Sequence, residues 1–268
     1  MELKDILVHF DYRRQSVARL DLALQLAQQY DAQLTAIYVS RRLSVFDKGG
    51  EGEVDPEAAR QFFAQKRAAA GVGGDWVHVD GTASGLDLTE AVNLHAHYHD
   101  LLVVGQEDPE AGAQELLELP MRAVISAGRP VLIVPYAGTF DSIGKRVLLA
   151  WRGGPESARA LKDALPLLRQ AREVHVIAVK TPGFDFDFGP YREFLVGHLA
   201  LHGIEATVEA PDAGRLSVGD LLLNRAADLG SDLLVMGAFA QSWRGKPAIG
   251  EVGRHLLQCM TIPVLMSH

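Results

Sequence analysis

Short apolar runs alternate with longer segments of helical periodicity along the chain. Several of the short runs contain no polar residue, as in 101–104 and 131–134. Continuous apolar strands separated by helices indicate a parallel sheet that is covered on both faces, because the crossover helices bury each face. The expected strands are 5–10, 34–39, 75–80, 100–105, 130–135, 146–151, 174–179, 205–210, 232–237 and 263–268. The expected helices are 14–29, 55–70, 86–98, 119–127, 155–171, 190–203, 215–229 and 248–259.

The second half of the chain repeats the first. The segment KDILVHFDYRRQSVARLDLALQLA, from Lys4, aligns with KRVLLAWRGGPESARALKDALPLL, from Lys145, at a constant offset of 141. Further on, HDLLVVG and RPVLIVP match SDLLVMG and IPVLMSH at an offset of 132 to 133. A register kept over a whole half indicates a duplicated domain of about 130 residues, since a solenoid would repeat at a much shorter period.

The predicted domains are 1–140 and 141–268, and each is a doubly wound α/β domain with a five-stranded parallel sheet. In this architecture ligands bind outside the carboxyl ends of the strands, where the strand order reverses. The residues that follow the first and fourth strands of each half are therefore the candidates for a binding site.

The composition excludes some partners. With 48% hydrophobic and 22% charged residues, the chain is typical of a globular protein. A formal net charge of -8 argues against nucleic acid or an anionic membrane as the main partner, since either would be repelled. No run approaches about 18 uninterrupted apolar residues, and MELKDILVHF lacks a secretion signal, so we expect a cytoplasmic protein that does not span a membrane. The single cysteine, Cys259, falls in an apolar helix, where we expect a buried and unreactive thiol.

Several motifs occur in the same order in both halves: ILVHFD, DLLVVGQ and GRPVLIVPYAG in the first, then IGKRVLLAW, DLLVMGAF and PVLMSH in the second. With these motifs the sequence resembles the universal stress protein family in its tandem two-domain form. The resemblance implies two domains of the adenine nucleotide alpha hydrolase-like fold, packed as an intrachain pseudo-dimer. The chain would be a monomer or a homodimer of tandem chains. It also implies stress-linked roles without a well-defined reaction.

Many members of that family bind ATP through a loop of the form Gly, two residues, Gly, nine residues, Gly and then Ser or Thr, whereas others do not bind it. A phosphate needs inward-pointing backbone N–H groups, which glycine permits and a helix N-terminus supplies. In the second half, Gly237 and Gly250 take the first and third glycine positions, but Ala240 stands at the second. Glu251 puts a carboxylate where a hydroxyl is expected, so the site is predicted to be degenerate.

The alternative for the second half is an ATP- or AMP-binding switch, or a weak ATPase, that uses magnesium. Arg244 and Lys246 could reach the phosphates as point charges, though they also suit a solvated loop. Trp151 could stack on an adenine or fill its place. The residues expected around a nucleotide, of which Trp151, Val179 and Met236 would line the adenine pocket, are Trp151, Arg152, Val179, Met236, Gly237, Ala240, Arg244, Gly250, Glu251 and Val252.

The first half is less suited to a phosphate. Its candidate residues are Asp11, Val39 and Gly105, and Asp11 matches an acidic residue that contacts adenosine in family members. Asp11 could equally cap the helix that follows it. The segment after Gly105 would repel a triphosphate, because it carries Glu107, Asp108, Glu110, Glu115 and Glu118.

Two further segments allow more than one interpretation. In a strand, His95, His97 and His99 would share a face and could bind zinc, but in a helix they would diverge, and histidine is favoured at a helix C-terminus in any case. The segment 182–190 alternates phenylalanine with aspartate, which suits a lid, a docking loop, or a loop whose aromatic rings pack back onto the domain.

The sequence contains no Walker A pattern, no G-x-S-x-G elbow, no G-x-G-x-x-G and no C-x-x-C. The favoured interpretation is therefore a non-enzymatic stress-response protein that binds or regulates, with a degenerate nucleotide site. The nucleotide switch or weak ATPase is the first alternative. Metal binding through the histidines is the second.

Overall fold

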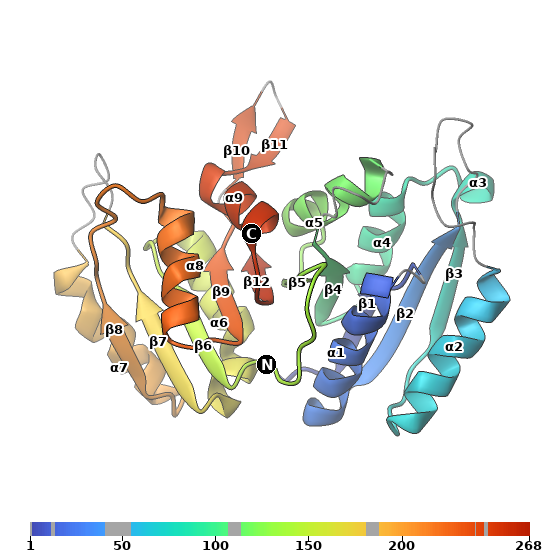
Figure 1. The fold of residues 1–268 in the computed structure, drawn as a ribbon, viewed down its shortest axis with the longest axis horizontal. Coiled ribbons are helices and arrows are strands. Elements are labelled where there is room, and N and C mark those ends of the chain that lie inside the picture. Colours follow the sequence, from blue (N-terminus) through green and yellow to red (C-terminus); the bar gives the residue numbers. More distant parts are fainter. Residues whose placement is uncertain are drawn as a thin grey trace. The chain divides into compact units, whose positions relative to one another are not determined.

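The computed structural model describes residues 2–11, 14–40, 55–106, 114–180, 188–238, 240–243 and 246–268. It divides into two compact units, Glu2–Asp141 and Ser142–His268, which are called the N-terminal and C-terminal units below. Each unit consists of parallel strands flanked by helices (Figure 1). Residues singled out in the sequence that lie outside the described part are Glu107, Asp108, Glu110, Arg244 and 182–187.

The strands of the N-terminal unit are parallel and have the order β3-β2-β1-β4-β5. The order reverses between β1 and β4, so the ends of these two strands mark the crevice of the sheet. Because parallel crossovers are right-handed, α1 and α2 lie on one face and α4 and α5 on the other, where α4 packs against α5. The elements are β1 (Asp5–His9), α1 (Arg14–Tyr30), β2 (Gln33–Ser40), α2 (Pro56–Ala69), β3 (Trp76–Asp80), α3 (Gly81–Ser84), α4 (Leu88–Ala96), β4 (Leu101–Gly105), α5 (Gln114–Ser126) and β5 (Val131–Val134).

The C-terminal unit repeats this plan with the strand order β12-β9-β6-β7-β8. Its order reverses between β6 and β9, and α8 packs against α9 on one face of the sheet. The elements are β6 (Arg146–Ala150), α6 (Pro155–Gln170), β7 (Glu173–Ile177), the 3-10 turn η1 (Gly189–Tyr191), α7 (Arg192–Leu201), β8 (Ala206–Glu209), α8 (Val218–Asp228), β9 (Leu233–Gly237), β10 (Ala240–Trp243), β11 (Lys246–Ile249), α9 (Glu251–Cys259) and β12 (Val264–Ser267).

An aspartate directly before the fourth strand anchors the start of the first strand in both units. Asp100 Oδ2 accepts hydrogen bonds from the backbone N–H groups of Lys4 and Asp5, at 2.9 and 3.1 Å. Asp232 accepts from the backbone N–H groups of Lys145, directly before β6, and of Arg146, its first residue, at 3.1 and 2.9 Å. This shared contact gives a physical reason for the repeated motif DLLV, and it fixes the amino edge of each sheet.

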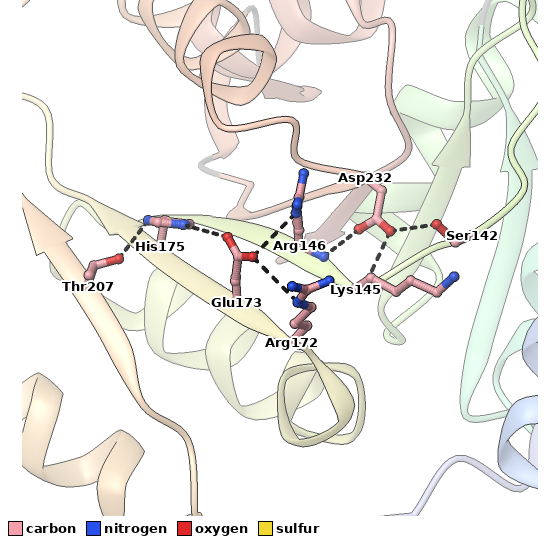
Figure 2. A network of polar contacts seen from close by, with 8 residues as sticks. All are labelled: Ser142, Lys145, Arg146, Arg172, Glu173, His175, Thr207 and Asp232. Carbon is pink, nitrogen blue, oxygen red and sulfur yellow. Dashed lines mark hydrogen bonds and ion pairs between the residues drawn. The ribbon is translucent and has the colours of Figure 1, made fainter.

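Figure 2 shows the polar network that surrounds Asp232 at the amino edge of the C-terminal unit. The hydroxyl of Ser142 donates to the Asp232 carboxylate at 3.0 Å. The Glu173 carboxylate lies at ion-pair distance from Arg146, Arg172 and His175, at 3.5, 3.8 and 3.7 Å. Pairs at this degree of exposure contribute little stability individually. The network therefore ties the starts of β6, β7 and β9 together.

The predicted doubly wound α/β fold is confirmed. The segment predicted as a loop after the fourth strand of the second half instead contains an antiparallel hairpin, β10 and β11. For this reason α9 begins at Glu251, three residues after the predicted start. The short helix α3 was not predicted, and α5 begins at Gln114, before its predicted start.

The expectation of a buried thiol is wrong, because Cys259 is exposed. The buried side of α9 consists of Gly253, Leu256 and Leu257, and Cys259 falls outside it at the end of the helix. As to membranes, none of the helices in the described ranges combines the length and the apolar character that crossing a bilayer would require.

A candidate ligand site in the C-terminal unit

A cavity of about 290 Å³ opens in the C-terminal unit. It lies where β6, β7 and β9 end, with the beginnings of α6 and α9 and one side of α8 completing its wall. This is the reversal point of the strand order, where doubly wound sheets bind their ligands. The lining residues are Ala150, Trp151, Arg152, Ser157, Ile177, Val179, Val218, Leu222, Met236, Gly237, Ile249, Gly250, Glu251, Val252 and Gly253.

Most of the cavity wall is apolar. Trp151 and Val179 follow the first two strands of the unit, and Met236 belongs to β9. Among the lining residues, those with a charged or hydroxyl side chain are Arg152, Ser157 and Glu251. An apolar wall with a few polar groups is the usual composition of a small-molecule site, in which the polar groups fix the orientation of the ligand.

Two glycines turn the chain from β6 into α6. Gly153 and Gly154 have φ values of 73° and 123°, which few other residues adopt. Pro155 then begins the helix, where its missing N–H costs nothing. This tight turn brings Ser157 back to the strand end, and its Oγ accepts a hydrogen bond from the backbone N–H of Arg152 at 3.3 Å. The turn therefore places a hydroxyl and a guanidinium-bearing residue beside the same cavity.

The first turn of α9 forms another part of the wall. Gly250 is its N-cap, with φ −60° and ψ 166°, a conformation open to any residue, and no side chain caps the first turn. Glu251, Val252 and Gly253 all line the cavity. The backbone N–H groups at a helix start carry a partial positive charge that favours an anion. The carboxylate of Glu251, the first residue of α9, would repel an anion bound at this helix start, so a highly charged ligand is disfavoured.

A hydrogen-bonded triplet joins α8 to α9 beside the cavity. His255 Nε2 lies 2.8 Å from Asp220 Oδ1, and the hydroxyl of Ser217 donates to Asp220 Oδ2 at 2.7 Å. Ser217 also caps α8 by accepting from the backbone N–H of Asp220 at 3.0 Å. These bonds, first that of Ser217 and then that of His255, lower the pKa of Asp220 from its usual value. The triplet holds the helix that contributes Val218 and Leu222 against the helix that contributes the anion-favouring turn.

The structure brings together most of the residues named in the sequence for the second half. Eight of them line the cavity: Trp151, Arg152, Val179, Met236, Gly237, Gly250, Glu251 and Val252. Ala240 lies in β10, where it pairs with Ile249 of β11. Arg244 is outside the described residues.

The lining residues that sequence reasoning missed have two origins. Ser157 aligns with Ser16 in the internal repeat, so its position next to the first strand could have been found from the sequence. Val218 and Leu222 carry no comparable signal, since an apolar residue on one side of a helix is expected to face the core. Ile177 and Ile249 are buried strand residues for which the same holds.

The corresponding place in the N-terminal unit contains an arginine. Arg19, in α1, forms an ion pair with Asp11 at 3.3 Å, and its guanidinium lies against Gly105 at the end of β4. Val39 lies in β2, where it pairs with Val79 of β3. Two of the three residues named for this half, Asp11 and Gly105, thus meet around a buried side chain.

The histidine segment has the helical geometry. His95 is in α4, His97 is its C-cap and His99 follows. The Nδ1 atoms of His95 and His99 lie 2.8 Å from the backbone oxygens of Ala91 and His95. Across the residues that the structure describes, no group of three or more His, Cys, Asp or Glu is placed to hold a metal ion. This segment therefore lacks the strand geometry on which the zinc alternative depended.

Each unit has a parallel sheet whose strand order reverses once, which defines a doubly wound α/β fold, and the C-terminal unit has a cavity at its reversal point. Over 98% of its length the chain is similar in structure to 97% of a universal stress protein from Archaeoglobus fulgidus DSM 4304, with a TM-score of 0.69 and 15% sequence identity. A functionally unknown protein from Pseudomonas aeruginosa PAO1 gives a TM-score of 0.67 at 17% identity, covering 99% of this chain and 92% of that one. No protein-family model matches the chain, and no curated protein matches it significantly. At these identities the likeness establishes the fold.

Proposed function

We propose that the chain is a non-enzymatic binding protein of the universal stress protein type, whose C-terminal unit binds the adenosine part of an adenine nucleotide. The observation that carries the proposal is the cavity between β6, β9 and the first turn of α9, at the strand reversal of the sheet. The structural similarity to a universal stress protein over nearly the whole chain supports a stress-linked role.

The chemistry of the wall supports a purine nucleoside as the ligand. Trp151, Val179 and Met236 offer flat and apolar surface to a base, which prefers to stack on an aromatic ring or lie between apolar side chains. Ser157 and Arg152 offer hydrogen-bonding groups that suit the hydroxyls of a ribose. The cavity of about 290 Å³ is at the small end of the range of ligand pockets, roughly 300 to 1,000 Å³, so it suits a nucleoside or mononucleotide.

The start of α9 supports a single phosphate rather than three. Its uncapped first turn favours one anion, as helix N-termini generally do. Each further phosphate adds negative charge near the carboxylate of Glu251, which lines the same cavity. We therefore expect AMP to bind more tightly than magnesium ATP. The protein would then respond to the concentration of AMP or adenosine.

Thermal unfolding in the presence of adenosine, AMP, ATP and ATP with magnesium tests the proposal. A ligand at a hundred times its dissociation constant stabilises the folded protein by about 2.7 kcal/mol, which raises the midpoint by several degrees. The expected order of midpoints places AMP above ATP. If none of these ligands shifts the midpoint at millimolar concentration, the proposal fails. Phosphate release from ATP, measured in parallel, would identify the weak ATPase instead.

Cavity-filling variants locate the binding site. Val218→Trp places a large ring in the cavity wall on α8, so AMP binding should be lost. Val196→Trp makes the same change on α7, at a residue that does not line the cavity, and should leave AMP binding unchanged. Equal affinities of the two variants for AMP would place the ligand elsewhere.

A further inference from the structure

The N-terminal unit contains a charged side chain at the place where the C-terminal unit has its cavity. In the internal repeat Arg19 aligns with Ala160, and Asp11 and Ser16 align with Arg152 and Ser157. Arg19 is only 5% exposed, which is rare for arginine unless its charge is paired. A buried guanidinium must have partners for its donors, since an unpaired buried charge is costly.

The surroundings of Arg19 supply those partners. Its Nε donates to the backbone oxygen of His9 at 2.7 Å. Its Nη2 donates to Ser16 Oγ at 3.1 Å and to Asp11 Oδ1 at 3.3 Å. One planar cation thus meets a carbonyl at the end of β1, a carboxylate two residues further on and a hydroxyl in the first turn of α1. This is the geometry of a built guanidinium site, because the donors of that group lie in a fixed fork.

Gly105 belongs to the same arrangement. A β-carbon at this position would collide with Nη1 of Arg19. In the C-terminal unit the equivalent glycine, Gly237, faces the backbone of α6 at Glu156 and Ser157. The glycine that ends the fourth strand therefore admits a side chain in one unit and a helix backbone in the other.

Aromatic rings cover the place that corresponds to the base-binding wall. Phe10, the counterpart of Trp151, is fully buried. Its ring stacks on that of Phe62 of α2, with 6.0 Å between centroids and 6° between planes, and Trp76 meets it edge-on at 6.3 Å. Trp151 instead lines the cavity of its own unit. The aromatic residue at this position is therefore buried under other rings in the N-terminal unit and faces a cavity in the C-terminal unit.

We propose that Arg19 is a built-in ligand: the N-terminal unit holds a guanidinium-binding site that its own arginine occupies, and so takes no nucleotide. Arg19 is then the residue that makes the chain a one-site protein. The number of nucleotides per chain rests on the proposed function of the C-terminal unit, whereas the guanidinium site does not.

Chemical rescue tests the guanidinium site directly. Arg19→Ala removes the atoms of an ethylguanidinium ion, and this soluble cation should return to the vacated place. We expect R19A to unfold at a lower temperature than the wild type and to regain several degrees with millimolar ethylguanidinium, since binding to the folded state stabilises it. Ethylammonium, which has the charge but not the planar fork, should give no comparable gain. Arg60→Ala, which removes an exposed arginine of α2, is the matched control and should not respond. A folded R19A that responds no more than R60A would overturn the proposal.

Two measurements keep the proposal testable if R19A does not fold. In the wild type, the Nε–H of Arg19 should give a slowly exchanging NMR signal that is absent in R19K, and the lack of such a signal would overturn the site. Titration with AMP should give one site per chain in the wild type, so two sites would overturn the one-site role of Arg19. A titration that shows no AMP binding would count against the proposed function alone, and the rescue experiment would still decide on Arg19.

Discussion

The backbone nitrogen of Ser157 lies 2.6 Å from the point where a β-carbon of Gly237 would stand. The first turn of α6 thus rests directly on the end of β9, and only a residue without a side chain permits this approach. By resemblance to the universal stress proteins, Gly237 takes the first glycine position of the phosphate-binding loop. The structure gives it a second role that does not depend on a ligand, which is to let α6 bring Ser157 to the cavity.

Gly237→Ala should therefore destabilise the protein even without any ligand. The new methyl would collide with backbone atoms of Glu156 and Ser157, which cannot move aside as a flexible side chain would. We expect a loss of about 1 to 3 kcal/mol in the free energy of unfolding, the usual cost of overpacking. Gly197→Ala is the matched control, because nothing lies within 4 Å of the added β-carbon in α7, and it should gain roughly 0.5 to 1 kcal/mol. Urea unfolding of both variants measures the difference, and a G237A protein as stable as the wild type would contradict the packing role.

Glu251→Gln should raise the affinity for ligands in proportion to their negative charge. The substitution removes the negative charge of a residue that lines the cavity at the start of α9, and it keeps the size of the side chain. A unit charge near a phosphate in water is worth about 1 kcal/mol, so the affinity for ATP relative to adenosine should rise roughly fivefold. Calorimetric titration with both ligands gives this ratio. Glu193→Gln, on the exposed side of α7, should leave it unchanged. An unchanged ratio in E251Q would show that phosphates do not approach this turn.

The sequence predicted the strands well, because runs such as LLVV and VLIV can be buried only in a sheet that is covered on both faces. The hairpin β10–β11 was missed for a physical reason. Its segment carries Gly245 and Pro247, residues that usually interrupt strands, and its two strands pair with each other in a separate sheet. A two-stranded pairing outside the main sheet leaves little hydrophobic pattern to detect.

The candidate site was predictable only in part. Trp151 and Gly237 could be named because strand ends at a reversal point are where ligands bind. Arg19 could not, since a sequence shows an arginine on a helix and gives no sign that Gly105, far along the chain, leaves room for it. A charged side chain is buried only where partners from distant parts of the chain surround it, and the local pattern of apolar and polar residues contains no information about them.

Asp5→Asn should stabilise the N-terminal unit at neutral pH. Burial, opposed by His99 and aided by the charges of Asp100 and Asp75, raises the pKa of the Asp5 carboxyl. The folded state therefore binds this proton more readily than the unfolded state, and the contribution of Asp5 to stability is lost as the pH rises through its folded pKa. We expect D5N to unfold at a higher temperature than the wild type at pH 7, with the gap closing as the pH falls toward about 4. Asp141→Asn, an exposed control, should show no such trend. A gap that is the same at both pH values would mean that the ionisation of Asp5 plays no part.

The pKa of Asp220 is shifted downward, in the opposite direction to that of Asp5, and replacing Asp220 should loosen the wall of the cavity. The hydroxyl of Ser217, and after it the imidazole of His255, lower the pKa of this carboxyl, so the folded state binds its proton less readily than the unfolded state. Its contribution is complete above the usual value of about 3.9 and is lost as the pH falls through the lower folded pKa. The acid-induced part of the decline in melting temperature should therefore be smaller in Asp220→Asn than in the wild type.

The same substitution should weaken AMP binding at neutral pH. The neutral amide has one acceptor oxygen in place of two, which weakens the bonds to Ser217 and His255 that hold Val218 near the first turn of α9. Asp228→Asn removes an exposed carboxylate from the other end of α8. Its ion pair with Arg225, at 3.7 Å, is a surface pair worth little, so this control should change stability only slightly and leave AMP binding unchanged. If D220N binds AMP as the wild type does while its acid profile changes, the triplet stabilises the unit without shaping the cavity.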